Sequence, residues 1–360
     1  MQLFKKLVFP FYIILIISCD LYPDKSRGSI FKWQTAKPED HGLDSEQLEK
    51  AFLEAQNKSS IYSLLIIKDG YIVGERYYHG HDANSSFNIR SVSKSFLSAL
   101  IGIAIENGII NGLDTKVLNY FPEYVHNSLD KRKQDITIEH LLTMQAGIDR
   151  DQSIYSKIFN TDNWIKSTIE EKLIYDPGER WVYNTFLTHL LSGIITKSAE
   201  MSTYDFAKEF LFDPLGIEIQ DWKQSPQGIY FGGNNMFFTT RDMAMLGLLY
   251  LNNGELNDVQ IVPHDWVEQS LQNTMPDFQK GWTWGKLENG GYGYLWWLGE
   301  ISGYKIFTAL GHGGQFVMCF PDLDMIVVTN SNAYVDWDTA DKNERIVLDL
   351  IANYILPAIR

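Results

Sequence analysis

Cysteine is scarce in this sequence. The chain of 360 residues has two cysteines, and the first, Cys19, lies at the edge of an N-terminal apolar segment. If that segment is a targeting signal, Cys319 has no partner left, which excludes a disulfide framework. Metal-ligating patterns are also missing, because the nearest histidine pair, His79 and His81, has no neighbouring cysteine or third histidine to complete a site. We therefore expect neither a metal nor another cofactor.

Basic charge is scarce as well. Lys and Arg number 31 against 45 Asp and Glu, which gives a formal net charge of −14. Such an acidic surface argues against nucleic acid or anionic lipid headgroups as partners, and it leaves a small-molecule substrate open. The hydrophobic share of 45% in a chain of this length is ample for a large folded core.

The N-terminal residues resemble a targeting segment. Two lysines precede an apolar stretch, residues 7–17, which is short for a membrane span and typical of a signal peptide. The stretch ends at a serine followed by Cys19, which resembles the bacterial lipobox, where the cysteine is acylated after cleavage. We predict a signal peptide over residues 1–18 and a lipid-anchored tether over 19–35, so that the protein faces the periplasm or lies at the outer membrane. An uncleaved anchor and an ordinary secretory signal are the alternatives.

Residues 36–360 are predicted to form one folded domain. Asp69-Gly70 between two apolar segments is a strong hairpin signal, and the chain from about Thr137 to Leu271 has mainly helical and loop patterns. Strands and then a final helix follow at residues 292–298, 304–310, 315–320, 325–330 and 339–355. This order predicts an α/β fold of the α+β kind, in which N- and C-terminal segments share an antiparallel sheet flanked by helices and the middle forms a mostly helical second lobe.

Ser91 and Lys94 stand at the start of a helix predicted over residues 92–107, which is apolar on every side and so expected to be buried. Positions three apart share a face in the first turn, so the Lys94 amine can reach the Ser91 hydroxyl. A serine hydroxyl becomes a strong nucleophile when a base takes its proton, and burial at a helix N-terminus lowers the pKa of a lysine. The alternative is that Ser91 is only an N-cap, but a capping box has Glu or Gln where this sequence has Lys94.

The segment Ser91-Val92-Ser93-Lys94-Ser95-Phe96 looks like the nucleophile motif of the beta-lactamase-related serine hydrolases. That family includes class C beta-lactamases, penicillin-binding DD-peptidases, family VIII esterases and 6-aminohexanoate-dimer hydrolases. Further segments resemble the family's other motifs in the right order over roughly residues 40–355: His140–Met144 with Ala146-Gly147, Pro177–Glu179 with Tyr183–Thr185, Gly232-Gly233, Thr240–Ala244, Gly247–Leu249 and Gly311–Gln315.

The resemblance implies a role for each matching position. Ser91 would be the acylated nucleophile, Lys94 its base or proton relay, and Tyr183 a general base or a proton shuttle to the leaving group. To act as a base at neutral pH, the Tyr183 phenol would need a lowered pKa. The alternative is that Tyr183 is only an aromatic residue packed in the core. Gly314 and its neighbour would let a strand approach the substrate closely, and the backbone N–H groups of Gln315 and Ser91 would form an oxyanion hole. A plain hairpin turn is the alternative at that place.

Two positions depart from the family pattern. Thr185 stands where the second motif usually has asparagine, and Asn184, one position early, is expected to point elsewhere. His312 stands where beta-lactamases have a lysine that binds the substrate carboxylate, and a neutral histidine supplies no fixed charge. This departure argues against beta-lactam or D-Ala-D-Ala substrates and favours esters or amides. The glycine-rich oxyanion loop of α/β-hydrolases is excluded, because the chain has no Gly-x-Ser-x-Gly elbow.

The sequence thus predicts a serine hydrolase that forms an acyl-enzyme with a small ester, amide or peptide. Beta-lactamase or DD-peptidase activity is one alternative, and a catalytically inactive binding protein on the same fold is another. The substrate groove is expected between the two lobes. Four tryptophans lie on segments that could border it, with ordinary core packing as the alternative: Trp282, Trp284, Trp296 and Trp297.

Overall fold

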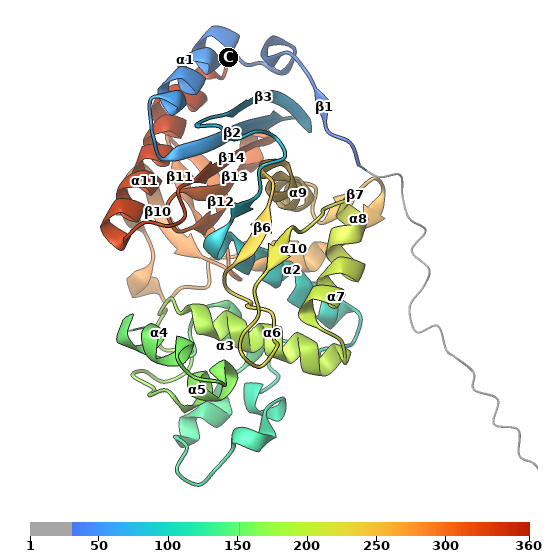
Figure 1. The fold of residues 1–360 in the computed structure, drawn as a ribbon, viewed down its shortest axis with the longest axis vertical. Coiled ribbons are helices and arrows are strands. Elements are labelled where there is room, and N and C mark those ends of the chain that lie inside the picture. Colours follow the sequence, from blue (N-terminus) through green and yellow to red (C-terminus); the bar gives the residue numbers. More distant parts are fainter. Residues whose placement is uncertain (1–30, 151) are drawn as a thin grey trace, which may run out of the picture.

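The computed structural model describes residues 31–150 and 152–360 (Figure 1). The predicted signal peptide and Cys19 lie outside the described residues, so their assignment stays a prediction. Within the described part of the chain, no helix has both the length and the apolarity needed to cross a membrane.

A nine-stranded sheet forms the centre of the fold. Its order is β1-β3-β2-β14-β13-β12-β11-β10-β9, and every neighbouring pair is antiparallel except β1 and β3, which are parallel. Strand β2 from the N-terminal part lies beside β14 from the C-terminal part, so the predicted sheet shared by the two ends of the chain is confirmed. The strands are β1 (Gln34–Thr35), β2 (Ile61–Lys68), β3 (Tyr71–Tyr77), β9 (Trp282–Trp284), β10 (Leu287–Tyr292), β11 (Trp297–Ile301), β12 (Tyr304–Gly311), β13 (Gln315–Phe320) and β14 (Met325–Ser331).

Local sequence explains the turn that starts this sheet. Asp69 and Gly70 join β2 to β3 with φ angles of 50° and 79°, the left-handed conformation that a tight two-residue hairpin requires. One predicted strand is wrong: of residues 292–298, Tyr292 ends β10, residues 293–296 form a connection, and Trp297 begins β11. Leu295 has a φ of 64° and breaks the run, and a Cβ at Gly293 would lie only 2.1 Å from the Ser270 carbonyl oxygen.

Two hydrophobic cores lie on opposite faces of the sheet, because alternate residues of each strand point to opposite sides. In β2, Leu64 and Ile66 face the helices α1 (Ser45–Gln56) and α11 (Trp337–Leu350), which Figure 1 draws side by side although they come from opposite ends of the chain. Leu65 and Ile67 face α2 (Ser93–Glu106) and α9 (Thr240–Leu251). Every residue of β13 and β14 is buried, since both faces of these strands are covered.

The middle of the chain forms the mostly helical second lobe that the sequence predicts (Figure 1). A small sheet that the sequence analysis missed, with the order β4-β6-β5, joins two strands of this part to β4 from before α2. Its strands are too short to give a pattern: β4 (Phe87–Asn88), β5 (Asp221–Trp222) and β6 (Met236–Phe238). The helices of this part are α3 (Ile138–Leu142), α4 (Gln152–Phe159), α5 (Trp164–Glu170), α6 (Thr185–Ala199), α7 (Thr203–Ala207), α8 (Asp213–Leu215) and α10 (His264–Ser270), and a short hairpin is formed by β7 (Glu255–Leu256) and β8 (Val259–Gln260).

Candidate active site

Ser91 lies in a single 3₁₀ turn, η2 (Arg90–Val92), immediately before α2. The residue before it, Arg90, has a φ of 51°, a left-handed conformation that is uncommon outside glycine. Val92 takes the N-cap position of α2 and no side chain caps this end of the helix. The alternative that Ser91 is merely a helix cap is therefore wrong, and its hydroxyl has another partner.

That partner is Lys94. Its side chain is only 1% exposed, and its Nζ atom lies 2.8 Å from the Ser91 Oγ and 2.6 Å from the carbonyl oxygen of Gly233. Burial lowers the pKa of Lys94 well below its ordinary range. A lowered pKa favours the neutral amine, which is the form that accepts a proton from a neighbouring hydroxyl.

Tyr183 joins this pair from the segment before α6. The Lys94 Nζ lies 5.1 Å from the centre of the Tyr183 ring. Burial raises the pKa of the Tyr183 phenol, and a hydrogen bond with Ser91 opposes that rise only partly. The lowered phenol pKa that a general-base role would need is therefore not found, because burial has the largest effect on it. The structure brings all three predicted catalytic side chains together, with Tyr183 as a neutral phenol.

The two residues after Tyr183, Asn184 and Thr185, form the start of helix α6. Asn184 caps α6, since its Oδ1 accepts the Phe186 N–H at 2.9 Å while its Nδ2 donates to the Asp149 carbonyl at 2.8 Å. It therefore points elsewhere, as predicted. Thr185 is the first residue of α6, and its methyl group would lie 2.6 Å from a Cβ at Gly233. Thr185 thus packs against Gly233, whose carbonyl oxygen accepts a hydrogen bond from Lys94.

Gly233 is a site residue that the sequence analysis did not assign. Its carbonyl oxygen is the second partner of the Lys94 amine. A Cβ on either residue of the Gly232-Gly233 pair would approach Thr188 to 2.2 and 2.4 Å, so glycine is required for this close passage. In the sequence, the Gly232-Gly233 pair marked a family-like segment, but it did not indicate a contact with Lys94.

The third motif is the turn from β12 to β13, residues 311–315. Gly313 and Gly314 have φ angles of 87° and 104°. A Cβ at Gly311 would lie 2.4 Å from the Ile89 carbonyl oxygen, so glycine lets this turn press against the chain just before Ser91. The Gln315 side chain is buried within the sheet, where its Nε2 donates to the Ser331 carbonyl at 2.8 Å. A substrate role for Gln315 is therefore left to its backbone N–H.

His312 faces the loop after β14. Its Nε2 lies 2.8 Å from the Val335 carbonyl oxygen, and its ring packs edge-on against Trp337 at 4.7 Å. Burial lowers the pKa of His312, and the positive charge of Arg90 acts in the same direction. His312 is thus neutral at neutral pH, as the sequence analysis assumed.

A buried acid next to this turn was missed. Glu344 on α11 accepts the Gly313 N–H with its Oε1 at 2.9 Å, and burial raises the pKa of its carboxyl to about 7. The sequence offered one signal, a glutamate among apolar positions on the inner face of the last helix. Without the fold, nothing connected that residue with the glycine turn.

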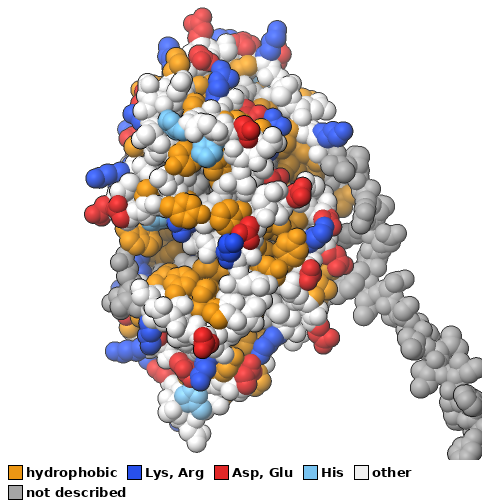
Figure 2. All heavy atoms as spheres, in the orientation of Figure 1, with side chains coloured by type: hydrophobic (Ala, Val, Ile, Leu, Met, Phe, Trp, Pro, Cys, Tyr) orange, Lys and Arg blue, Asp and Glu red, His pale blue; other side chains and the backbone are white. Residues whose placement is uncertain are grey.

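Two of the four tryptophans that could border a groove lie near Tyr183. Trp297 lies 5.6 Å from the Tyr183 ring, and Trp282 packs edge-on against Trp297 at 5.9 Å. Trp181, which was not among the four tryptophans, packs against both Tyr183 and Trp297. Trp296 is instead a core residue with no exposed surface, and Trp284 donates its indole N–H to Asp341 at 2.7 Å. Figure 2 shows apolar side chains gathered across the middle of the face drawn.

A metal centre finds no support in the described residues, where no three His, Cys, Asp or Glu side chains cluster in a way that could hold an ion. Cys319 is a free, buried thiol in β13.

Comparison with known proteins agrees with this geometry. A family model described as Beta-lactamase matches residues 46–351. The chain belongs to the beta-lactamase family. Beta-lactamase-like protein 4 of Dictyostelium discoideum is 24% identical over 314 residues, which cover 72% of this chain and 53% of that protein, so the match spans about half of the relative's length.

Two other members are similar over more of their own length. The 6-aminohexanoate-dimer hydrolase of Paenarthrobacter ureafaciens is 23% identical over 303 residues, covering 77% of this chain and 74% of that enzyme. The solved structure of EstCE1, a hydrolase with promiscuous acyltransferase activity, superimposes with a TM-score of 0.69 at 15% identity and covers 84% of this chain and 97% of that one. The beta-lactamase/transpeptidase-like fold predicted from the sequence is confirmed, and this protein is a member of a hydrolase family.

Proposed function

We propose that this beta-lactamase-family protein is a serine hydrolase that cleaves ester or amide bonds of small substrates through an acyl-enzyme. The observation that carries the proposal is the 2.8 Å contact between the buried Lys94 amine and the Ser91 hydroxyl. A buried amine with a lowered pKa beside a hydroxyl is the arrangement in which a serine becomes a nucleophile. A protein that only binds its ligand has no need of a buried lysine, because burying that charge costs stability.

The proposed acylation proceeds through three proton transfers. The neutral Lys94 amine takes the Ser91 proton while Oγ attacks the substrate carbonyl carbon. The backbone N–H groups of Ser91 and Gln315 then stabilise the oxyanion. Tyr183, a neutral phenol, donates its proton to the leaving oxygen or nitrogen and recovers one from the Lys94 ammonium. Its raised pKa favours this shuttle role over that of a permanent base.

Deacylation reverses the same steps with water. Water replaces the leaving group, gives a proton through Tyr183 and Lys94, and attacks the acyl carbon, after which Ser91 leaves as the neutral hydroxyl. Atoms and protons balance, because the net reaction adds one water across the cleaved bond. No further group is needed for either half of the cycle.

Labelling with a fluorophosphonate probe tests the proposed function. The wild type should be labelled and Ser91→Ala should not. The same pair should differ in release of nitrophenolate from p-nitrophenyl butyrate. Labelling that is equal in both proteins would contradict the proposed nucleophile, and its absence from a folded wild type would favour the inactive binding protein.

We also propose, from the sequence alone, that Cys19 is lipid-anchored in the cell envelope. The cysteine follows an apolar stretch and a serine, as in a lipobox. In a bacterial host, a palmitate analogue should label the wild type but not Cys19→Ser, and the variant should leave the membrane fraction. A wild type that is never labelled would contradict the anchor without bearing on Ser91.

A further inference from the structure

Arg90, the residue before the proposed nucleophile, is a half-buried cation that forms no ion pair with any described residue. Its guanidinium Nη2 donates to the Ala333 carbonyl oxygen, and its Cζ lies 5.0 Å from the centre of the Tyr334 ring. Burial lowers the pKa of Arg90, and no carboxylate among the described residues opposes that effect. Other arginines of this acidic chain have such partners: Arg76 pairs with Glu49, Arg132 with Asp130 and Asp176, Arg241 with Glu75, and Arg345 with Asp341.

The hydrogen-bonding capacity of Arg90 is only partly used. Its Nε is buried and has no partner in the described structure. A guanidinium has five N–H donors, and a buried donor without an acceptor destabilises the folded state. The left-handed φ of 51° at this residue adds strain that a glycine would not have. The unpaired Nε and the strained backbone both destabilise the folded state. An arginine at this position therefore indicates a ligand that accepts hydrogen bonds from its free N–H groups.

The place of this cation relates it to the reaction. Arg90 and Ser91 belong to the same 3₁₀ turn, and a Cβ at Gly311 of the third motif would lie 3.1 Å from the Arg90 Cβ. The charge of Arg90 also reaches His312 strongly enough to lower the pKa of that histidine. The fixed positive charge that His312 does not supply is therefore present beside the third motif, on a different residue.

We propose that Arg90 binds a carboxylate of the substrate and that the enzyme prefers acidic esters or amides to neutral ones. Arginine suits this task because its planar fork can donate two parallel hydrogen bonds to a carboxylate. Tyr334, whose side chain is 70% exposed, covers the guanidinium and can turn aside without loss of core packing. This inference rests on the proposed hydrolase function and adds the substrate class to it.

Two matched esters test the proposal: the mono-p-nitrophenyl ester of glutaric acid, and the same compound with its free carboxyl methylated. The wild type should have a kcat/KM at least tenfold higher on the acidic ester, mainly through a lower KM. Arg90→Gln should reduce the ratio of kcat/KM on the acidic ester to kcat/KM on the neutral ester to about one, and Arg90→Lys should retain part of the preference; a general disturbance of Ser91 would lower both values and leave their ratio unchanged. Arg76→Gln, which breaks a surface pair with Glu49, is the control and should keep the full preference.

Equal efficiency of the wild type on both esters, or an undiminished preference in Arg90→Gln, would overturn the proposal. Neither result would affect the hydrolase itself, which depends on Ser91. A binding measurement separates the two further: calorimetry of the acidic ester with Ser91→Ala should give at least tenfold tighter binding than with the Ser91→Ala, Arg90→Gln double variant. Equal affinities would refute the role of Arg90 even if no ester were turned over.

Discussion

Among the described residues, two lysines are almost completely buried: Lys94 beside Ser91 and Lys133 in the helical lobe, with 1% and 3% of their surface exposed. Both donate to a backbone carbonyl oxygen, of Gly233 and Glu171 respectively. Burial lowers the pKa of both, that of Lys133 to about 8. By burial and pKa alone, the two lysines are alike.

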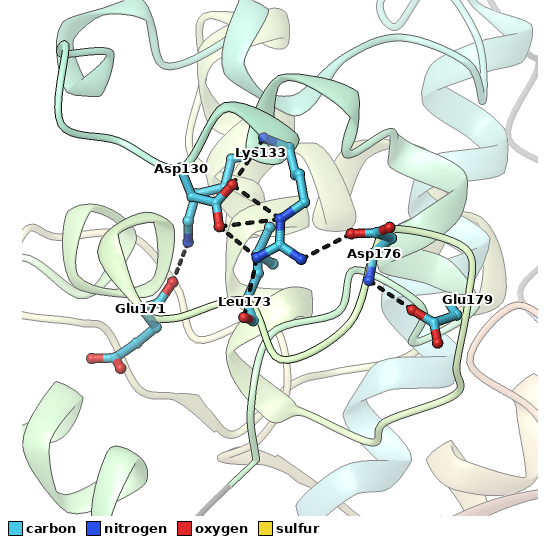
Figure 3. Close-up of polar contacts among 7 residues, drawn as sticks. Asp130, Lys133, Glu171, Leu173, Asp176 and Glu179 are labelled. Atoms are coloured by element: carbon cyan, nitrogen blue, oxygen red, sulfur yellow. Dashed lines mark hydrogen bonds and ion pairs between the residues drawn. The ribbon is translucent and has the colours of Figure 1, made fainter.

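The two lysines differ in the side chains that surround them. Figure 3 shows Lys133 near Asp130 and Glu171, and the negative charges of these residues oppose the effect of burial on the Lys133 pKa. No carboxylate in the described part of the chain acts on Lys94 in this way, and its neighbour is the Ser91 hydroxyl. Burial lowers the pKa of both lysine amines, but only the Lys94 amine lies beside the hydroxyl of the proposed nucleophile. Lys133 serves the structure by holding the chain at Glu171.

The largest expected effect comes from removing each amine. Lys94→Met should lower kcat/KM on p-nitrophenyl butyrate by at least about 100-fold, since a proton acceptor is lost. Lys133→Met, its matched control, should stay within about twofold of wild type. Steady-state kinetics on both variants decide the matter, and comparable losses would mean that position beside Ser91 does not distinguish the two lysines.

Tyr183→Phe extends the comparison to the partner of Lys94. The ring keeps its packing against Trp297, but the shuttle hydroxyl is gone, so kcat should fall by about 100-fold with little change in KM. Tyr292→Phe, a buried phenol 6.3 Å away ring to ring, is the control. A similar loss in both variants would indicate disturbed packing rather than a lost proton.

The pH dependence of stability sharpens the contrast at Lys133. The unfolded chain holds this proton up to about pH 10.5, while the folded chain releases it above about pH 8. The free energy of unfolding should therefore rise with pH between these values, by on the order of 3 kcal/mol. Urea titrations of wild type and Lys133→Met across this range measure the effect, and parallel curves would show that Lys133 does not titrate there.

Glu344 gives the opposite sign. Its pKa is raised from 4.5 to about 7, so the folded state holds a proton that the unfolded state has lost, and stability should fall as pH rises between these values. Asp341 and Arg345 face this carboxyl with opposite effects on its pKa, and the Gly313 N–H favours its charged form. Glu344→Gln should flatten that part of the profile, with a smaller loss of activity, up to about tenfold, from the loosened glycine turn. An unchanged slope would place the titration elsewhere.

How much the sequence could predict depends on how far apart along the chain the residues of each contact lie. Ser91 and Lys94 meet within one turn of chain, so their spacing was sufficient. The Asp69-Gly70 hairpin was readable for the same reason. Tyr183 was found through its order among the motifs rather than through geometry.

The contacts that were missed all cross the fold. The Gly233 carbonyl reaches Lys94 across 139 residues of sequence, and Glu344 reaches Gly313 from a helix on the other face of the sheet. Likewise, only the folded structure shows that no described carboxylate pairs with Arg90. Local propensity carries no information on such pairs, because tertiary packing decides them.

The pairing of β2 with β14 bears on how the molecule is made. Ser63 and Asn330, whose side chains hydrogen-bond at 3.0 Å, are 267 residues apart in the chain. The sheet cannot close until nearly the whole polypeptide has left the ribosome, although the helical segments between can form earlier. Closing so long a loop costs entropy before any native pairing compensates it, which makes assembly of the sheet a slow step. A chain that is still incomplete therefore carries Ser91 and Lys94 without the glycine turn of residues 311–315, so the proposed site cannot assemble on it.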